Sequence, residues 1–211
     1  MYEEYWGLSG LPFRNEADGE WFCKTPGYEE ALARLFYLVE QRRRCGLLSG
    51  PAGTGKSLLL KILFTELQRS QRQAAFINAA GLSRQELLAE LCDALLLPTE
   101  PTAPPLVHWR CLKDYLSGNS VAHMQTVLLF DQFERADHEC VLLIEHFLHL
   151  DVATGGLTVI VAARPEASAL SELADVADLR IEVSPLDRSG TTVYIAELLE
   201  QAGSNRHPFE P

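Results

Sequence analysis

Short apolar runs alternate along most of this chain with longer segments in which apolar residues recur every three or four positions. A short continuous apolar run bounded by turn residues predicts a strand that is buried on both faces. The sequence shows no internal repeat and no low-complexity tract, so the alternation describes one continuous fold. The expected strands are residues 45–50, 74–81, 126–131, 157–163 and 179–184.

The longer segments have the periodicity of amphipathic helices, and some of them carry recognisable start signals. Thr25 can cap a helix, and Pro26 suits a first helical turn. Ser83 and Glu86 form the Ser-x-x-Glu pattern of a capping box. Residues 98–107 are rich in proline and are expected to form a loop. The expected helices are 26–44, 57–70, 84–97, 108–117, 139–150, 167–174 and 188–202.

Strands that alternate with helices predict a three-layer α/β fold, in which helices cover both faces of a mostly parallel five-stranded sheet. The chain has 211 residues, of which 47% are hydrophobic and 22% are charged, enough for one such domain. Residues 25–186 are the expected core. Residues 1–24 carry more large aromatic side chains than a disordered tail would, so this segment is expected to pack on the core.

The formal net charge is −11, which opposes nonspecific binding to nucleic acid. Nucleic acid is therefore not an expected partner. Positive charge is concentrated locally at Arg42, Arg43 and Arg44, at the end of an expected helix, where cations favour the helix macrodipole. A solvated helix end explains this triplet better than a binding patch does.

The sequence contains no sign of membrane insertion or secretion. No apolar run approaches the roughly 20 residues that span a bilayer, and the acidic, aromatic N-terminus lacks the pattern of a secretory signal. A cytoplasmic location is expected. The cysteines, which form no CxxC pair and have no histidine at metal-ligand spacing, are expected to be buried or half-buried thiols. They are Cys23, Cys45, Cys92, Cys111 and Cys140.

Residues 50–57, GPAGTGKS, match the phosphate-loop pattern G-x-x-x-x-G-K-[ST] at every fixed position. The glycines let the backbone turn tightly, and the loop N–H groups together with the N-terminus of the next helix form a nest for anions. Lys56 is expected to contact the β- and γ-phosphates and Ser57 to coordinate Mg²⁺. The expected ligand is a purine triphosphate, ATP or its product ADP. The expected contacts are Gly50, Pro51, Ala52, Gly53, Thr54, Gly55, Lys56, Ser57 and Leu58.

A second nucleotide motif is expected at residues 127–131, where the apolar run VLLF is followed by Asp131. Asp131 would lie at the C-terminal end of a strand beside the phosphate loop and hold Mg²⁺ through water. The next residue is Gln132, although a second acid usually follows in this motif and activates the attacking water.

Two stretches resemble the general secretion pathway protein A type of AAA+ ATPases: the N-terminal MYEEYWGLSGLPF and KTPGYEEALARLFYLVEQRRRCGLLSGPAGTGKS. That family has D-E-A-Q at the second motif and G-Q-P-E after the next strand. Here these positions read D-Q-F-E (131–134) and A-R-P-E (163–166). The stretch LRIEVSPLDRSGTTVYIAELLEQAG is similar to a later part of the family, so the resemblance covers nearly the whole chain.

The resemblance implies an ATP-binding AAA+ module, in a branch close to replication-initiation and transposition-helper ATPases. In secretion systems such proteins help to place the outer-membrane secretin through the cell wall, so it implies an envelope component as partner. Their full-length forms carry a transmembrane segment, and this chain would then be the cytoplasmic domain of a longer protein. The resemblance also implies a nucleotide-dependent oligomer and a small helical lid, of which residues 187–211 would be the first part.

Two departures from the family bear on catalysis. Gln132 can hydrogen-bond the attacking water but cannot accept its proton as a carboxylate would, and such a loss costs on the order of 10²–10⁴ in rate. Arg164 stands where the family has a neutral first sensor. It is expected either to bind the γ-phosphate and stabilise transition-state charge, or to pair with Glu166 as a solvent-facing loop residue.

Glu134 is a candidate substitute for the missing base, subject to a geometric condition. In an extended strand it would lie about 10 Å beyond Asp131, so only a turn directly after Gln132 would bring it back. Asp137 is a weaker candidate and is more simply the cap of the helix that follows.

The resemblance also assigns roles to residues outside these motifs. Arg180 would be either an arginine finger that reaches a neighbouring subunit's phosphate or a partner in an interdomain salt bridge. Pro12 and Phe13 would lie near the adenine, with packing of Phe13 in the core as the alternative.

Three functions follow from the sequence. The first is an ATP-binding AAA+ module with slow hydrolysis, acting as a switch or assembly factor in a secretion-type system. The second is a DNA-linked helper ATPase of transposition or initiation, which the acidic charge opposes. The third is a non-hydrolysing interaction scaffold, which the complete phosphate loop opposes.

Overall fold

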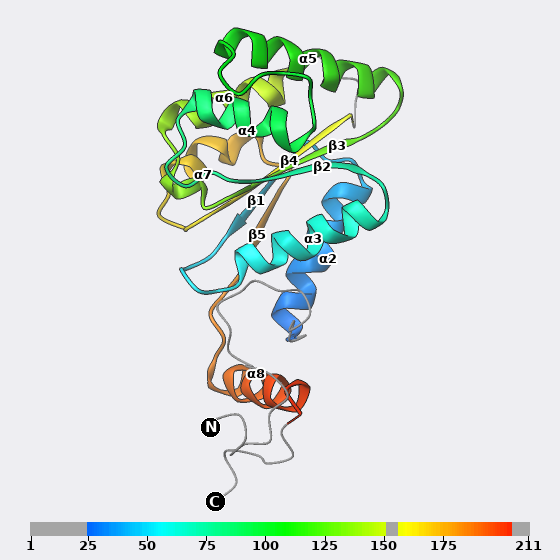
Figure 1. Ribbon diagram of the computed structural model, residues 1–211. Helices are drawn as coiled ribbons and strands as arrows, with labels where there is room; N and C mark the ends of the chain where they lie inside the picture. Colours follow the sequence, from blue (N-terminus) through cyan, green and yellow to red (C-terminus); the bar gives the residue numbers. More distant parts are fainter. Residues whose placement is uncertain (1–24, 151–155, 204–211) are drawn as a thin grey trace, which may run out of the picture.

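The computed structural model describes residues 25–150 and 156–203, and its centre is a five-stranded sheet (Figure 1). The strands are β1 (Cys45–Ser49), β2 (Gln73–Asn78), β3 (Thr126–Asp131), β4 (Leu157–Ala163) and β5 (Leu179–Glu182). Their order is β2-β3-β4-β1-β5, and every neighbouring pair is parallel. The expected α/β fold with a parallel five-stranded sheet is therefore confirmed.

Helices cover both faces of this sheet and complete the three layers. The helices are α2 (Pro26–Glu40), α3 (Lys56–Arg69), α4 (Arg84–Ala94), α5 (Pro105–Val121), α6 (His138–His149), α7 (Ser168–Glu172) and α8 (Arg188–Gln201). Two short 3₁₀ helices are η2 (Phe133–Arg135) and η3 (Leu173–Val176). Figure 1 shows α2 and α3 on one face, α4 to α7 on the other, and α8 apart from the sheet beyond β5.

The central strands β1, β3 and β4 are buried on both faces because each contributes to two separate cores. In β3, Leu128 and Phe130 belong to the core beneath α4, α5, α6 and α7. The alternate residues Val127 and Leu129 belong to the core beneath α2 and α3. Successive side chains of a strand point to opposite faces, so a continuous apolar run fills both cores, as the sequence predicted.

The expected end of the first helix near Arg44 was wrong, since α2 ends at Glu40. Arg42 has a left-handed φ of +51°, which reverses the chain directly after the helix. The basic triplet therefore follows the helix instead of forming its last turn. Its side chains bind carbonyls of other elements: Arg42 donates to His123 O at 3.3 Å and Arg44 donates to Leu150 O at 3.1 Å.

The expected loop at 98–107 was wrong at its C-terminal end, because α5 already begins at Pro105. Proline is tolerated in the first helical turn, where its missing N–H would have no helical partner and its fixed φ suits the helix. Pro104 occupies the N-cap position of this helix. α5 also continues to Val121, beyond the expected end at 117.

The helix caps were predicted with mixed success. The capping box is confirmed, since Ser83 N donates to Glu86 Oε2 at 2.8 Å and Glu86 N donates to Ser83 Oγ at 3.4 Å. Thr25 and Asp137 do occupy the N-cap positions of α2 and α6. Within the part of the chain that the structure describes, however, neither side chain makes a capping hydrogen bond.

None of the helices in residues 25–150 and 156–203 combines the length and the apolar character needed to cross a bilayer. Within the same ranges Cys45, Cys92 and Cys140 are buried thiols and Cys111 is half-buried, as expected. The expected packing of residues 1–24, the end of the expected lid and Cys23 lie outside the described residues.

Candidate nucleotide site

The C-terminal ends of the central strands bring most of the expected site residues to one edge of the sheet. β4 lies between β1 and β3, so the residue after β4, Arg164, lies between the phosphate loop 50–57 and Asp131. The register supports this placement, because Ser49 at the end of β1 pairs with Ala163 at the end of β4. Ligands of open parallel sheets bind outside this edge.

The phosphate loop connects β1 to α3 and has the backbone that its glycines predict. Gly53 and Gly55 have φ values of +82° and +83°, a left-handed conformation that glycine adopts at little cost. Thr54 Oγ1 donates to Pro51 O at 2.9 Å and closes the turn. α3 begins at Lys56, directly after the loop, so its unpaired N–H groups are available to an anion.

Gly50 is required for a different reason than Gly53 and Gly55, which allow the loop to turn. Its φ is not positive, but a Cβ at this position would lie 2.4 Å from Val183 O and 2.8 Å from Thr54 Oγ1. Val183 N donates to Ser49 O at 2.7 Å, which holds the chain after β5 against the start of the loop. Glycine is therefore needed here because another backbone passes close to it.

Lys56 lies across the phosphate loop. Its Nζ donates to Gly50 O at 2.6 Å and to Pro51 O at 2.9 Å. Burial lowers the pKa of Lys56, and the carboxylates of Glu134 and Asp131 oppose this change, with Glu134 the stronger of the two. A phosphate in the loop would offer this ammonium a charged partner in place of two neutral carbonyls.

Asp131 is only 3% exposed and ends the fully buried strand β3. Its Oδ1 accepts a hydrogen bond from Gln132 N at 2.9 Å, which orients the carboxylate. Ser57 lies in the first turn of α3, at the same edge of the sheet. A hydroxyl and a carboxylate oxygen are a donor set that suits Mg²⁺, which takes one or two carboxylates together with phosphate oxygens. These two side chains are therefore the ones that could hold Mg²⁺.

The chain turns directly after β3, which meets the geometric condition set for Glu134. Gln132 has a left-handed backbone with φ 52° and ψ 38°, and η2 follows at once. Arg135 N donates to Gln132 O at 3.1 Å and closes this turn. Glu134 is therefore kept at the edge of the sheet instead of being carried away from it, and its side chain is 14% exposed.

Arg164 pairs with Glu134, so the alternative in which it pairs with Glu166 was wrong. Arg164 Nε lies 3.2 Å from Glu134 Oε1, while the arginine side chain is 44% exposed. The structure shows no ion pair between Arg164 and Glu166 in the ranges that it describes. Sequence reasoning missed the Glu134 pair because the two residues come together only through the neighbouring positions of β3 and β4.

Arg180 lies outside this cluster. It is exposed on β5, and its Nη2 donates to Ala174 O at 2.8 Å. Among the residues that the structure describes, it makes no salt bridge of the expected interdomain kind. Pro12 and Phe13 lie outside the described residues.

A hollow of about 670 Å³ is lined by the start of α2, the end of β5 and the chain that leads to α8. Tyr28, which sequence reasoning had not singled out, connects this hollow to the phosphate loop. Its hydroxyl would lie 3.2 Å from a Cβ at Gly55. The position of Tyr28 in an ordinary helix start carries no local signal of this contact.

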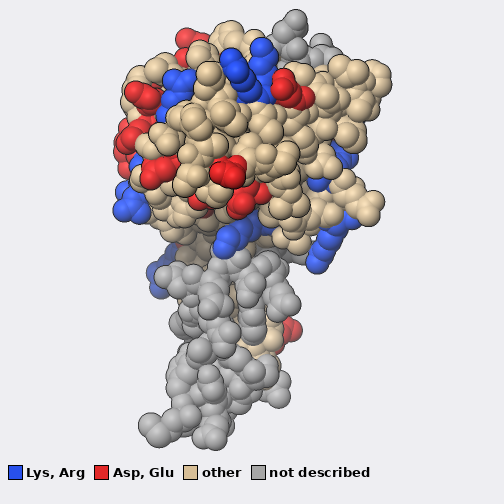
Figure 2. Space-filling model, turned by 45° about the horizontal axis from the view of Figure 1, so that its top comes forward, with Lys and Arg blue, Asp and Glu red and all other residues tan. Residues whose placement is uncertain are grey.

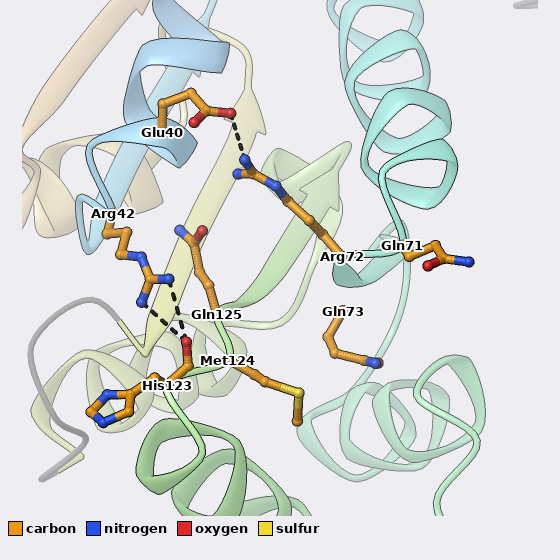
Figure 3. Close-up of a pocket in the computed structure, with 8 residues that line it drawn as sticks. All are labelled: Glu40, Arg42, Gln71, Arg72, Gln73, His123, Met124 and Gln125. Atoms are coloured by element: carbon orange, nitrogen blue, oxygen red, sulfur yellow. Dashed lines mark hydrogen bonds and ion pairs between the residues drawn. The ribbon is translucent and has the colours of Figure 1, made fainter.

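A second hollow of about 330 Å³ lies at the opposite edge, where β2 and β3 begin (Figure 3). Both of its arginines are already engaged. Arg72 Nη2 lies 2.6 Å from Glu40 Oε1, and Arg42 donates to His123 O. α2, α3 and α5 end at this edge, where helix dipoles favour cations over anions. A phosphate is therefore favoured at the other edge, where α3 begins.

Comparison with known proteins identifies the family of this chain. The sequence model of a family described as an AAA domain matches residues 39–170, more than half of the chain. This range contains the phosphate loop, Asp131 and Arg164. The General secretion pathway protein A of Aeromonas hydrophila is 28% identical over 221 residues, which cover 100% of this chain and 40% of that protein. The chain thus spans about two-fifths of the length of this relative.

Solved structures share the fold at low sequence identity. A Cdc6 protein of Pyrobaculum aerophilum has a TM-score of 0.71 and 14% identity, covering 90% of this chain and 52% of that one. The ORC1 protein of Aeropyrum pernix in complex with DNA has a TM-score of 0.64 and 11% identity, covering 95% and 55%. Drosophila ORC bound to DNA has a TM-score of 0.63 and 18% identity, covering 83% and 46%. These similarities concern the fold alone.

Proposed function

Because the chain belongs to the AAA domain family, we propose that it is a module that binds ATP with Mg²⁺ and hydrolyses ATP slowly. The observation that carries this proposal is the shared position of a complete phosphate loop and a buried Asp131 at one edge of a parallel sheet. The loop has the two left-handed glycines and the helix N-terminus that phosphate binding needs.

Each part of the nucleotide has a candidate site. The phosphates would lie in the loop 50–57 with Lys56, and Mg²⁺ would be held by Ser57 and Asp131. When bound, Mg²⁺ would neutralise charge that develops on the phosphates. The hollow bordered by Tyr28 adjoins the loop and is the candidate site for the base and sugar.

Slow hydrolysis is proposed because a carboxamide follows the metal-binding aspartate. Gln132 is half-buried directly beside Asp131, where it can orient a water molecule. It cannot take up the proton that the water loses on attack. General-base catalysis typically contributes a factor on the order of 10²–10⁴ to the rate. The site would therefore hold ATP for much longer than an efficient ATPase does, as suits a switch or an assembly factor.

Ligand-dependent melting and steady-state turnover test this proposal together. Mg-ATP at about 100 times its Kd should stabilise the fold by about 2.7 kcal/mol, a rise in Tm of roughly 5–11 °C. Lys56→Ala should remove most of this shift and serves as the binding control. Gln132→Glu should raise turnover by on the order of 10² or more.

Two outcomes would contradict the proposal. A wild-type chain whose Tm does not respond to millimolar ATP or ADP with Mg²⁺ would be a scaffold that retains the fold without the ligand. A wild-type rate on the order of 1–10 s⁻¹ that Gln132→Glu leaves unchanged would show that hydrolysis is not slow for the stated reason.

We further propose a cytoplasmic role in a secretion-type system, with a component of the cell envelope as protein partner. The motivation is the relative named General secretion pathway protein A, which matches along the whole of this chain. Nucleotide-dependent assembly would accompany this role, and the exposed Arg180 is the candidate contact between subunits. Sedimentation of the chain with ADP and with Mg-ATP tests assembly, and an unchanged mass in both states would count against it.

A DNA-linked helper ATPase is the second candidate, because two structures of the same fold contain DNA. The net charge of −11 opposes it. In Figure 2, Lys and Arg side chains are interspersed with Asp and Glu over the described part of the face shown. Binding of duplex DNA at micromolar protein, weakening steeply as salt rises, would support this second candidate.

A further inference from the structure

The Glu134 carboxylate has one oxygen engaged and one oxygen without a partner. Oε1 lies 3.2 Å from Arg164 Nε, and the side chain is 14% exposed. Oε2 is buried and has no hydrogen-bond partner among the residues that the structure describes. A buried carboxylate oxygen without a partner is costly, so this one calls for a functional explanation.

The turn that carries Glu134 is anchored in the core and is not an arbitrary loop. Phe133 is 1% exposed and packs edge-on against Phe130, with ring centroids 5.9 Å apart. The backbone on both sides is bonded to the chain that follows β2. Ala79 N donates to Asp131 O at 2.9 Å, and Gly81 N donates to Arg135 O at 2.9 Å. Glu134 is therefore held in a defined position.

That position is beside the phosphate site. Arg164 follows β4, the strand between β1 and β3, and its bond to Glu134 fixes the carboxylate toward the centre of this edge. The Glu134 carboxylate thus lies at the same edge of the sheet as Lys56 and Asp131, the residues expected to contact phosphate and metal.

We propose that Glu134 is the base of the slow hydrolysis proposed above: it replaces only in part the carboxylate that position 132 lacks, so Gln132→Glu still accelerates the reaction. The inference rests on the proposed ATP-binding function and deepens it. A water molecule attacks the γ-phosphorus, a new P–O bond forms, and the bond to the β–γ bridging oxygen breaks. The Glu134 carboxylate accepts the proton that the water loses and passes it on to the released phosphate. Arg164 holds one of its oxygens and so orients the base.

The alternative is that Glu134 only positions Arg164, and two substitutions separate these roles. Glu134→Gln keeps an oxygen that can accept from Arg164 but removes proton acceptance. Glu134→Ala removes both. Glu166→Gln is the matched control, since Glu166 is an exposed carboxylate in the loop that follows Arg164. Turnover is measured as single-turnover phosphate release, and binding is measured as the Tm shift with Mg-ATP.

We expect Glu134→Gln to keep the Mg-ATP shift in Tm and to lower turnover by on the order of 10², with Glu166→Gln unchanged. Adding Gln132→Glu to Glu134→Gln should restore turnover by returning a carboxylate to the water. Unchanged turnover in Glu134→Gln would overturn the inference. This holds even if Glu134→Ala is slow, because that result would show only that Glu134 positions Arg164.

The failure of the underlying function is distinguishable from the failure of this inference. A wild-type chain without a Tm response to Mg-ATP contradicts nucleotide binding itself. A wild-type chain that responds to Mg-ATP but releases phosphate no faster than Lys56→Ala contradicts hydrolysis, and with it the assignment of Glu134 as base, while nucleotide binding stands. Thermal melting of each variant without nucleotide shows whether that variant is folded. If Glu134→Ala does not fold, the comparison of Glu134→Gln with and without Gln132→Glu still tests the assignment.

Discussion

Replacing Gly50 by alanine should destabilise the fold, because the new methyl group would collide with the backbone that follows β5. The Cβ would lie 2.4 Å from Val183 O and 2.8 Å from Thr54 Oγ1. The carbonyl cannot easily retreat, since the N–H of the same Val183 donates to Ser49 O at 2.7 Å. Overpacking of this kind costs about 1–3 kcal/mol, and in a domain of this size the Tm should fall by roughly 2–12 °C.

Thermal melting of the variant without nucleotide measures this effect, with Gly118→Ala as the control. Gly118 is exposed within α5, and among the described residues no atom beyond its chain neighbours and the backbone of its own helix lies within 4 Å of a Cβ built on it. Alanine in a helix interior is favoured over glycine by about 0.5–1 kcal/mol, so the control should raise the Tm. The same chemical change is thus expected to act in opposite directions at the two sites.

A Gly50→Ala chain that melts at or above the wild-type temperature, while Gly118→Ala behaves as expected, would refute the argument. It would mean that the chain after β5 does not press on the phosphate loop in solution. If the argument holds, the Gly50→Ala chain should also bind Mg-ATP more weakly, because separating Val183 from the loop displaces the first turn of the phosphate site.

Other predictions test burial, titration and buried polar contacts. Alkylation followed by mass spectrometry should find Cys111 modified well before Cys45. Burial, with a contribution from Asp178, raises the pKa of Cys45 to about 12, and the thiolate is the reactive form. Faster labelling of Cys45 than of Cys111 would contradict the burial of Cys45. Hydrogen bonds from Ser83 hold the pKa of Glu86 below its usual value, so the capping box stabilises the fold above about pH 4.3 and loses this contribution as pH falls further. The Tm difference between wild type and Glu86→Gln should accordingly shrink in acid, and a difference that grows there would be inconsistent with the cap. Thr158→Val should cost about 1–3 kcal/mol in denaturant unfolding, because the buried hydroxyl donates to a backbone carbonyl at 2.6 Å and accepts from a buried glutamine amide at 2.7 Å; an unchanged midpoint would show that neither bond matters.

The Gln132 and Glu134 pair shows where local patterns stop being informative. The sequence Asp-Gln-Phe-Glu is recognisable as a motif that has lost its second acid. The left-handed conformation of Gln132 is not predictable from the sequence, because glutamine has no strong preference for it. That single backbone angle decides whether Glu134 lies at the phosphate edge or about 10 Å away.

Sequence reasoning also misplaced the start of α5 and the end of α2. The sequence predicts a loop at Pro105 because proline breaks a helix interior, but proline is allowed in the first turn, where Pro105 lies. Arg42 ends α2 through a left-handed conformation that arginine seldom adopts. In both places several backbone conformations are locally acceptable, and contacts with other elements select among them.

By itself the sequence determined the strand and helix order, the parallel sheet class and the phosphate loop, because each depends on residues that are close together in the chain. Only the tertiary structure decided that β4 lies between the loop and Asp131, that Glu134 pairs with Arg164, and that Gly50 makes room for Val183. These are contacts between distant segments, and they depend on strand order and on one turn. Periodicity and spacing report which face a residue takes within its own element, whereas the partner on another element is set by how the elements pack.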